Sequence, residues 1–233
     1  MAVTSETITM NQTAKQYRIN RNSFGDHYDI ESAEGQPVYY VEQWKFRSQS
    51  PDLTLHRGSD KSGPIVAVSH MPYWSNSFKV GLGDPSDPGS MLWEQMGKNG
   101  FTNKGSPWAA DIVAQPNEKK RLNLNWKTTK SVAAEGMKVP WSSSRNYKLI
   151  NEDTKDVIAV FTSDRSYKKC GVLQINVDYG TSFEFMIIMT CITVYENARR
   201  ESSEMRGGTV RSRSKWVSQP HMAQFFSGPD TVK

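Results

Sequence analysis

The sequence predicts an all-β protein with one helix, in which about twelve strands form a closed antiparallel barrel around a hydrophobic C-terminal helix. Twelve short runs rich in β-branched and aromatic residues follow one another between residues 15 and 178, bounded by Gly, Pro, Asn, Asp or Ser. An apolar stretch without Gly or Pro follows at 183–201. Side chains fill a barrel of about 8 strands, whereas about 16 strands leave a channel. Twelve strands therefore leave a lumen that an apolar helix can fill.

The composition is that of a globular protein. The chain has 233 residues, of which 36% are hydrophobic and 23% charged, and this excludes disordered, collagen-like and coiled-coil sequences. We expect three segments: an N-terminal extension at 1–14, the barrel with its helix at 15–201, and a basic, flexible tail at 202–233.

The predicted strands fall into two sets. The first set is 15–20, 27–32, 37–46, 52–57, 64–70 and 77–83. The second set is 91–96, 108–114, 121–129, 145–152, 156–163 and 170–178. Gly and Pro lie at the breaks, for example in GDPSDPG at 83–89, and favour hairpins over parallel crossovers.

The run at 121–129 has the clearest alternation. Leu122, Leu124 and Trp126 alternate with polar or charged residues, so one face of this strand is apolar and the other is polar. We expect the apolar face to contact the core and the polar face to contact water.

The predicted helix covers about 181–201. Thr181 or Ser182 is its expected N-cap, and Arg199 and Arg200 suit its C-terminal turn. Apolar side chains cover nearly the whole circumference, except for a thin stripe of Thr190, Thr193 and Asn197. The 13 residues 183–195 span roughly 20 Å at 1.5 Å per residue, against a bilayer core of about 30 Å. This favours a helix buried in protein; a membrane anchor or re-entrant segment is the alternative.

This order of elements resembles the tubby C-terminal-domain superfamily, which includes tubby proteins, phospholipid scramblases and LURP-one-related proteins. The fungal tubby-like and LURP-one-related branch is the most similar. The resemblance covers 15–201 and rests on LNLNWKTTK at 122–130, RNYKLIN at 145–151, DVIAVFTS at 156–163 and the closing helix with its paired arginines. It implies the plugged barrel and the binding of phosphoinositide headgroups.

The functional motifs of that superfamily do not transfer residue by residue. The lysine-arginine motif of tubby domains has no match, and Asp26, Asp29 and Glu31 are too interspersed with other residues to stand for the acidic calcium loop of scramblases. Candidate lipid-binding residues therefore come from basic clusters near two strands. They are Lys45, Arg47, Lys119, Lys120, Arg121, Lys127 and Lys130. The alternative is a solvated strand edge, where lysines discourage edge-to-edge pairing.

The positive charge is concentrated at the C-terminal end. The net charge is +5, and seven basic against three acidic residues from Arg199 onward contribute +4 of it. The nearly neutral remainder does not favour a nucleic-acid partner. Ser212 and Ser214 follow arginines, as the sites of basophilic kinases do, and phosphorylation would cancel the positive character of this segment. A flexible tail with incidental serines is the alternative.

The sequence contains no catalytic or metal-binding motif. The histidines form no zinc-binding pattern, there is no nucleophile elbow or phosphate-binding loop, and Cys170 and Cys191 suit buried apolar positions. We therefore expect no enzyme, no cofactor and no metal; a catalytic group assembled from distant residues is the less favoured alternative. Trp74 and Trp141 lie in loop-like segments and are candidate ligand contacts, with loop packing as the alternative.

These patterns lead to two functional hypotheses. The first is a cytoplasmic module that binds phosphoinositides or other anionic lipids peripherally at the plasma membrane, since no signal peptide and no spanning segment is visible in the sequence. The second is a soluble protein-interaction or structural module without a lipid ligand. The sequence names no protein partner.

Overall fold

The structure is a computed structural model that describes residues 14–22, 26–44, 50–98, 105–115, 118–140, 145–164 and 169–206. The chain divides into two units, residues 1–198 and 199–233, which are described separately. The first unit contains the barrel.

Twelve strands in the described residues form one antiparallel sheet. The first six are β1 (Lys15–Arg21), β2 (His27–Ser32), β3 (Pro37–Gln43), β4 (Leu53–Arg57), β5 (Ile65–His70) and β6 (Ser77–Leu82). The other six are β7 (Leu92–Gly97), β8 (Ser106–Gln115), β9 (Glu118–Thr128), β10 (Tyr147–Asn151), β11 (Val157–Ser163) and β12 (Lys169–Ile175). The strand order is β7-β6-β5-β4-β3-β2-β1-β12-β11-β10-β9-β8. Every predicted run overlaps one of these strands, so the all-β prediction is confirmed.

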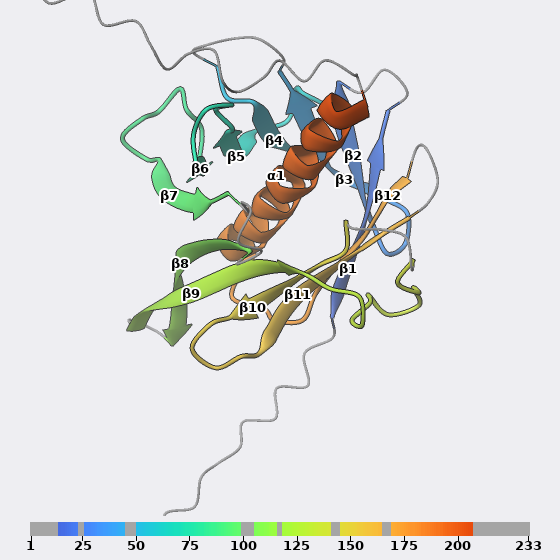
Figure 1. The fold of residues 1–233 in the computed structure, drawn as a ribbon. Coiled ribbons are helices and arrows are strands. Elements are labelled where there is room, and N and C mark those ends of the chain that lie inside the picture. The colour runs from blue at the N-terminus through green and yellow to red at the C-terminus, as the bar shows by residue number, and fades with distance from the viewer. Residues whose placement is uncertain are drawn as a thin grey trace, which may run out of the picture. The chain divides into compact units, whose positions relative to one another are not determined.

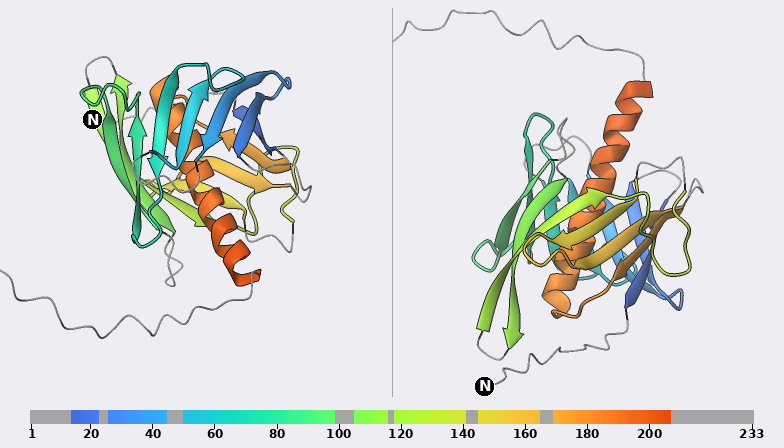
Figure 2. Two further views of the ribbon diagram at one scale, coloured as in Figure 1. Left: turned by 90° about the horizontal axis from the view of Figure 1, so that it is seen from above. Right: turned by 60° about the horizontal axis from the view of Figure 1, so that its bottom comes forward.

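The sheet curls into a nearly closed barrel (Figures 1 and 2), whose ends are β7 and β8. These two strands lie next to each other, but no backbone hydrogen bond joins them in the part of the chain that the structure describes. Pro107 of β8 packs beside Gly97 of β7 and has no backbone N–H to donate. Side chains join the two ends instead: the Arg121 guanidinium of β9 donates to both oxygens of Glu94 on β7, at 2.7 and 2.9 Å.

Strand β9 shows why the sequence forms this wall. Leu122, Leu124 and Trp126 are buried, and Arg121 and Asn123 are exposed, but Asn125 is buried and donates to Glu152 at 2.7 Å. The predicted apolar face is confirmed and contributes to the core of the barrel, whereas Asn125 on the predicted polar face is an exception because it is buried.

Residues 181–198 of helix α1 (Thr181–Arg206) pass between the β2–β5 and β8–β11 parts of the barrel wall (Figure 1). Every residue from Phe183 to Val194 is buried, which confirms the hydrophobic helix inside the barrel. The helix continues five residues beyond the predicted end at 201. The predicted N-cap is wrong, because the backbone N–H of Glu184 donates to the Gly180 carbonyl and Gly180 therefore occupies the cap position.

The threonine stripe of the helix is buried and satisfied. Thr190 donates to the Met186 carbonyl at 2.7 Å and accepts a hydrogen bond from the Trp126 indole N–H at 3.0 Å. Thr193 similarly contacts the Met189 carbonyl, at 2.8 Å, and the Ser69 hydroxyl, at 3.0 Å. These bonds remove the desolvation penalty that unpaired hydroxyls would carry in an apolar core.

Two buried carboxylates of the helix are held by the β1–β3 wall. Glu184 accepts hydrogen bonds from the hydroxyls of Tyr17 and Tyr39, both at 2.7 Å, and pairs with Lys15 at 2.9 Å. Glu196 accepts from the Tyr28 hydroxyl at 2.5 Å and from the Gln43 side-chain amide. The helix is therefore fixed by polar contacts near both ends of its buried segment as well as by apolar packing.

Candidate functional site

Two aromatic side chains project from the connection between β5 and β6. Trp74 is 90% exposed and Tyr73 is 61% exposed, and their rings meet edge to face with centroids 4.7 Å apart. The connection is held at its base, because Asp52 accepts a hydrogen bond from the Met71 backbone N–H at 2.6 Å. We call Tyr73 and Trp74 the aromatic tip. An exposed pair of large aromatic rings is typical of a surface that binds a partner or a membrane.

A groove of about 430 Å³ begins beside the aromatic tip, on the outer face of β5–β7. Antiparallel register places His70, Lys79 and Gln95 in one row across these three strands. Gly81 lies opposite Trp93 in the next row, and any Cβ at Gly81 would lie 2.8 Å from the Trp93 ring. The missing side chain thus leaves room for the indole, which forms part of the groove.

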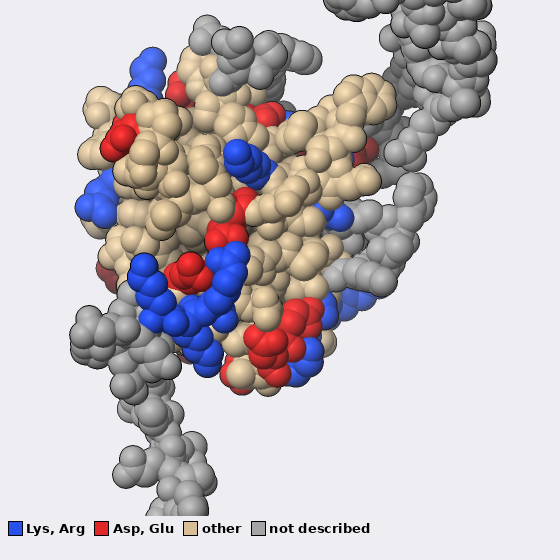
Figure 3. All heavy atoms as spheres, turned by 90° about the vertical axis from the view of Figure 1, so that its left-hand side faces the viewer, with Lys and Arg blue, Asp and Glu red and all other residues tan. Residues whose placement is uncertain are grey.

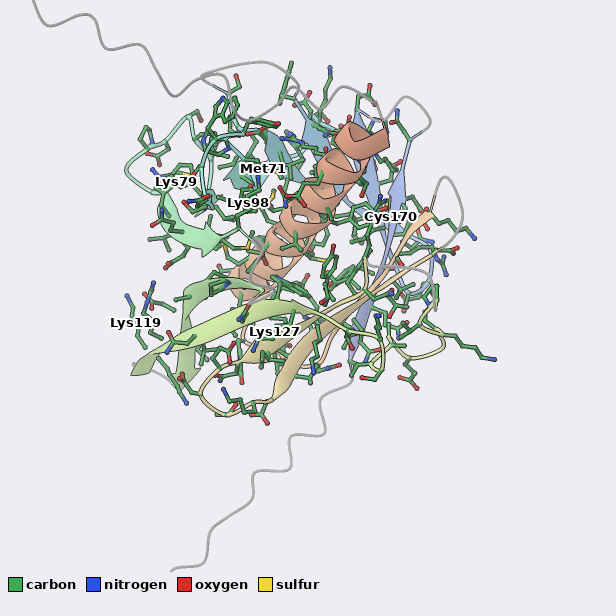
Figure 4. All side chains as sticks on the ribbon, viewed as in Figure 1. Met71, Lys79, Lys98, Lys119, Lys127 and Cys170 are labelled. Carbon is green, nitrogen blue, oxygen red and sulfur yellow. The ribbon has the colours of Figure 1, made fainter. Side chains whose placement is uncertain are left out.

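Two lysines lie over aromatic rings in this region. The Lys79 ammonium is 4.5 Å from the centre of the Trp93 ring, and the Lys98 ammonium is 5.9 Å from the centre of the Phe78 ring. The Lys98 backbone N–H donates to the Asn76 carbonyl at 2.9 Å, which brings Lys98 to the end of the sheet that carries the aromatic tip. Figure 4 shows Lys79 and Lys98 beside β6 and β7. Lysines with their stems against aromatic surface can present their charge to an anion in solvent.

Hydroxyl and amide groups line the same groove. Gln95 donates to the Ser77 hydroxyl at 2.9 Å, and the Ser75 and Ser77 hydroxyls lie 3.3 Å apart. Burial lowers the pKa of His70 below its usual value of about 6.5, and the Lys79 charge lowers it further against the opposing effect of Asp52. His70 is therefore neutral at pH 7, and the positive charge of the groove comes from lysine.

The basic cluster predicted on β9 is divided by its ion pairs. Arg121 is held by Glu94 and by Asp111, at 2.7 and 3.0 Å, and Lys127 pairs with Glu152 at 2.8 Å. Lys119, Lys120 and Lys130 are exposed. Figure 3 accordingly shows acidic side chains next to the basic ones on this face of the barrel.

The register also separates these residues. Arg121 and Lys127 are six positions apart on β9, which corresponds to about 20 Å along the strand. Figure 4 shows Lys119 near the end of the β8–β9 hairpin and Lys127 further along it. The structure therefore brings Lys119, Lys120 and Arg121 together at one end of β9, whereas Lys127 and Lys130 lie away from these three residues.

Several predicted residues lie outside the described part of the chain. These are Lys45, Arg47, Trp141, Ser212 and Ser214. Their roles stay predictions.

The two thiols do not form a reactive site. Burial raises the pKa of Cys170 to about 11, and it raises the pKa of the Cys191 thiol well above its usual range. Both are therefore protonated at neutral pH, whereas the thiolate is the nucleophilic form.

The described residues lack two further features. They hold no group of three or more His, Cys, Asp or Glu side chains arranged to bind a metal ion. No helix among them has the length and apolar character needed to cross a bilayer.

Comparisons with known proteins find a similar solved structure but no family and no curated relative. No protein-family model matches the sequence, and no curated protein matches it. A solved X-ray structure of a protein from Arabidopsis thaliana is similar, with a TM-score of 0.47 and 13% identity, over 80% of this chain and 91% of that chain.

Sequence reasoning found only part of this site. Trp74 stood out because it lies in the loop-like segment HMPYWSNS at 70–77. Lys79, Trp93 and Lys98 did not, because they are 14 and 5 residues apart along the chain and converge only through the β6–β7 register. For Lys79 a sequence signal exists. The alternation of SFKVGL at 77–82 turns Lys79 and Gly81 to the same outer face of the strand.

Proposed function

We propose that this chain is a non-catalytic module that binds the anionic surface of a membrane peripherally, through the aromatic tip and the lysines beside it. The single observation that carries the proposal is the position of Trp74 and Tyr73, both largely exposed, at the end of the sheet where Lys98 and Lys79 lie over aromatic rings. Tryptophan and tyrosine favour the membrane–water interface, where their apolar rings and polar groups are both accommodated.

Charge supplies the second contribution. Each lysine close to an anionic membrane contributes on the order of 1 kcal/mol, and the attraction decays within a Debye length of about 8 to 10 Å at physiological salt. Lys98 lies at the end of the sheet that carries the aromatic tip, and Lys79 lies on β6 in the adjoining groove. Lys119 and Lys120 lie near the other end of the β8–β9 hairpin. Lys119 pairs with Val113 of β8, which is six residues, or about 20 Å, from Pro107. Pro107 lies beside Gly97, at the end of the sheet that carries the aromatic tip. The proposal therefore assigns lipid contact to the β5–β7 face and gives the hairpin a minor part.

The proposal extends to the family and to the headgroup. A nearly closed barrel of twelve strands with a buried C-terminal helix is what membership of the tubby-like and LURP-one-related branch would require. A phosphoinositide is then the expected headgroup, with the groove at Lys79 as the place where a phosphate would lie. A cytoplasmic location at the plasma membrane belongs to the same proposal.

The alternative function, a protein-interaction module, is favoured by the ion pairs of Arg121 and Lys127, which weaken the positive field of the barrel. An exposed tryptophan is also a frequent anchor in protein interfaces. The two functions differ in whether lipid alone is sufficient for binding.

Vesicle flotation separates the two functions. The full chain is mixed at physiological salt with neutral phosphatidylcholine vesicles, with vesicles that also contain phosphatidylserine, and with vesicles that also contain phosphoinositides. We expect flotation with the anionic vesicles and none with the neutral ones. The variant with Tyr73→Ser and Trp74→Ser should bind at least tenfold more weakly, because two large apolar surfaces are lost from the contact.

The matched control is Leu92→Ser, which removes another exposed apolar side chain at the opposite end of β7. It should bind as the unmodified chain does. Absence of flotation with every anionic vesicle, or equal loss in the control, would overturn the proposal in favour of a protein partner.

A further inference from the structure

A different face of the barrel, the outer side of β2, β3 and β4, carries a cluster of acidic residues around one tyrosine. The register places Asp29 opposite Tyr40, Tyr40 opposite His56, and His27 opposite Glu42. Asp26 precedes β2, and Asp60 lies in the connection after β4. We call Asp26, Asp29, Glu42 and Asp60 the acidic patch. Aromatic surface and four carboxylates thus lie on one face.

The field of the acidic patch acts on the Tyr40 hydroxyl. Burial raises the pKa of Tyr40, and the charges of Glu42, Asp26, Asp29 and Asp60 raise it further, in that order. The His27 ring stacks on the Tyr40 ring with centroids 4.9 Å apart and lies 2.8 Å from Asp26 and 3.6 Å from Asp29. The patch therefore stabilises positive charge and disfavours additional negative charge.

His56 provides an independent indication of a ligand. Its Nδ1 lies 2.9 Å from the Gly63 carbonyl oxygen, which can only accept, so Nδ1 is the donor of this hydrogen bond. With a single ring proton, which Nδ1 holds, Nε2 is an acceptor. The residue is only 5% exposed, and Nε2 has no hydrogen-bond partner among the described residues. The nearest charged atom is a Glu42 carboxylate oxygen, 4.0 Å away.

His56 Nε2 and the Glu42 carboxylate oxygen face each other, and a donor placed between them would satisfy both. Glu42 already accepts a hydrogen bond from the Trp44 indole N–H at 3.0 Å, but a carboxylate has several acceptor positions. One nitrogen with two N–H bonds, placed about 2.9 Å from both atoms, would bridge acceptors that are 4.0 Å apart. An ammonium or guanidinium group has such a nitrogen, and it would also neutralise part of the surrounding negative charge.

We propose that the β2–β4 face is a docking surface for a basic segment of a partner protein, with an arginine or lysine side chain of that segment bound between Glu42 and His56. Tyr40 and His27 offer an aromatic surface against which the stem or the guanidinium plane packs. A peptide fits better than a metal ion, because the described residues contain no group of three ligating side chains. This inference is independent of membrane binding, which concerns another face.

Fluorescence anisotropy with a labelled arginine- and lysine-rich peptide tests the docking surface on the full chain, without vesicles. The unmodified chain should bind this peptide at physiological salt, more weakly at high salt, and should not bind a glutamate-rich peptide of the same length. The variant with Asp29→Asn and Glu42→Gln should bind at least tenfold more weakly. The matched control, Glu135→Gln with Asp153→Asn, removes two exposed negative charges elsewhere and should change the affinity less than twofold.

A second readout locates the contact. The nitrogen chemical shift of His56 Nε2 should move when the peptide is added, because a lone pair without a partner gains a donor. Asp29→Asn alone, at a half-exposed position that the fold tolerates, should weaken binding about threefold. No binding at millimolar peptide, equal affinity of the double variant and its control, or an unmoved His56 signal at saturation would each overturn the proposal.

Discussion

Tyr17 of β1 and Tyr28 of β2 have surroundings opposite to those of Trp74 and Trp93, which lie near β5–β7. Tyr17 and Tyr28 point into the barrel, and their hydroxyls donate to the helix carboxylates Glu184 and Glu196. Trp74 and Trp93 lie outside the barrel, where one is almost fully exposed and the other lies beneath a lysine ammonium. Both regions combine aromatic rings with charge. Burial and hydrogen bonding make the inner group structural, whereas exposure makes the outer group available to a ligand.

The largest effect should come from the inner group. Glu196→Ala leaves the Tyr28 hydroxyl and the Gln43 amide buried without their acceptor, and unsatisfied buried groups cost about 1 to 3 kcal/mol each. We expect the free energy of unfolding, measured by denaturant titration, to fall by about 4 kcal/mol. Glu135→Ala, at an exposed position, should change it by less than about 0.5 kcal/mol. A loss below about 1 kcal/mol for Glu196→Ala would show that the inner group is not structural.

The next effect is a loss of stability at alkaline pH. Burial raises the pKa of Cys170 from 9.0 to about 11, so the folded state keeps a proton that the unfolded state releases. Its contribution is complete below pH 9 and declines between pH 9 and pH 11, by about 2 to 3 kcal/mol. Denaturant titrations across this range should show a flatter decline for Cys170→Ala than for the unmodified chain. Parallel curves would contradict the burial of this thiol.

The position of Trp93, one of the two outer tryptophans, can be changed by a substitution at Gly81. A Cβ at Gly81 would lie 2.4 Å from the Met91 side chain and 2.8 Å from the Trp93 ring, so Gly81→Ala should displace the indole from the sheet. We expect thermal unfolding to report a loss of about 1 to 2 kcal/mol, because flexible side chains absorb part of the overlap. Flotation with anionic vesicles should weaken as well. Gly89→Ala, where the nearest atom is at 3.7 Å, is the control and should change neither measurement.

The smallest effect concerns Glu152, which lies in the turn after β10 and pairs with Lys127 of β9. Hydrogen bonds from Lys127, Asn125 and Lys155 lower the pKa of Glu152 from 4.5 to about 2. The contribution of this carboxylate is present above pH 4.5 and declines as the pH falls toward 2. Solvent screening keeps it below about 1 kcal/mol. Glu152→Gln should therefore lower stability slightly at pH 7 and not at pH 2, and an equal change at both pH values would contradict the ion pair.

The strands and the buried helix could be predicted because their signals are local. The alternation of Leu122, Leu124 and Trp126 indicates a half-buried strand, and the continuous apolar surface of residues 183–195 indicates a helix without a solvent-facing side. The helix carboxylates were not predicted as buried. Glu196 lies more than 150 residues from Tyr28 and Gln43, and no local pattern indicates that these three side chains meet.

The candidate site depends on register and pairing, which the sequence does not display. Lys119, Lys120 and Arg121 are adjacent in sequence and therefore suggested a patch, yet Arg121 is held by Glu94 from a strand 27 residues earlier. Lys79 and Trp93 are distant in sequence and meet because β6 pairs with β7. A count of cations thus favours the β8–β9 hairpin, whereas the ion pairs of Arg121 and Lys127 show that part of its charge is neutralised.

The most direct test compares two pairs of lysines with the same total charge. In flotation with anionic vesicles at physiological salt, Lys79→Met with Lys98→Met should lower binding about tenfold or more, at on the order of 1 kcal/mol per lysine. Lys119→Met with Lys120→Met should lower it less than about threefold, because these lysines lie beyond a Debye length from the tip. An equal or larger loss from the Lys119 and Lys120 pair would contradict the assignment of the lipid contact to the aromatic tip.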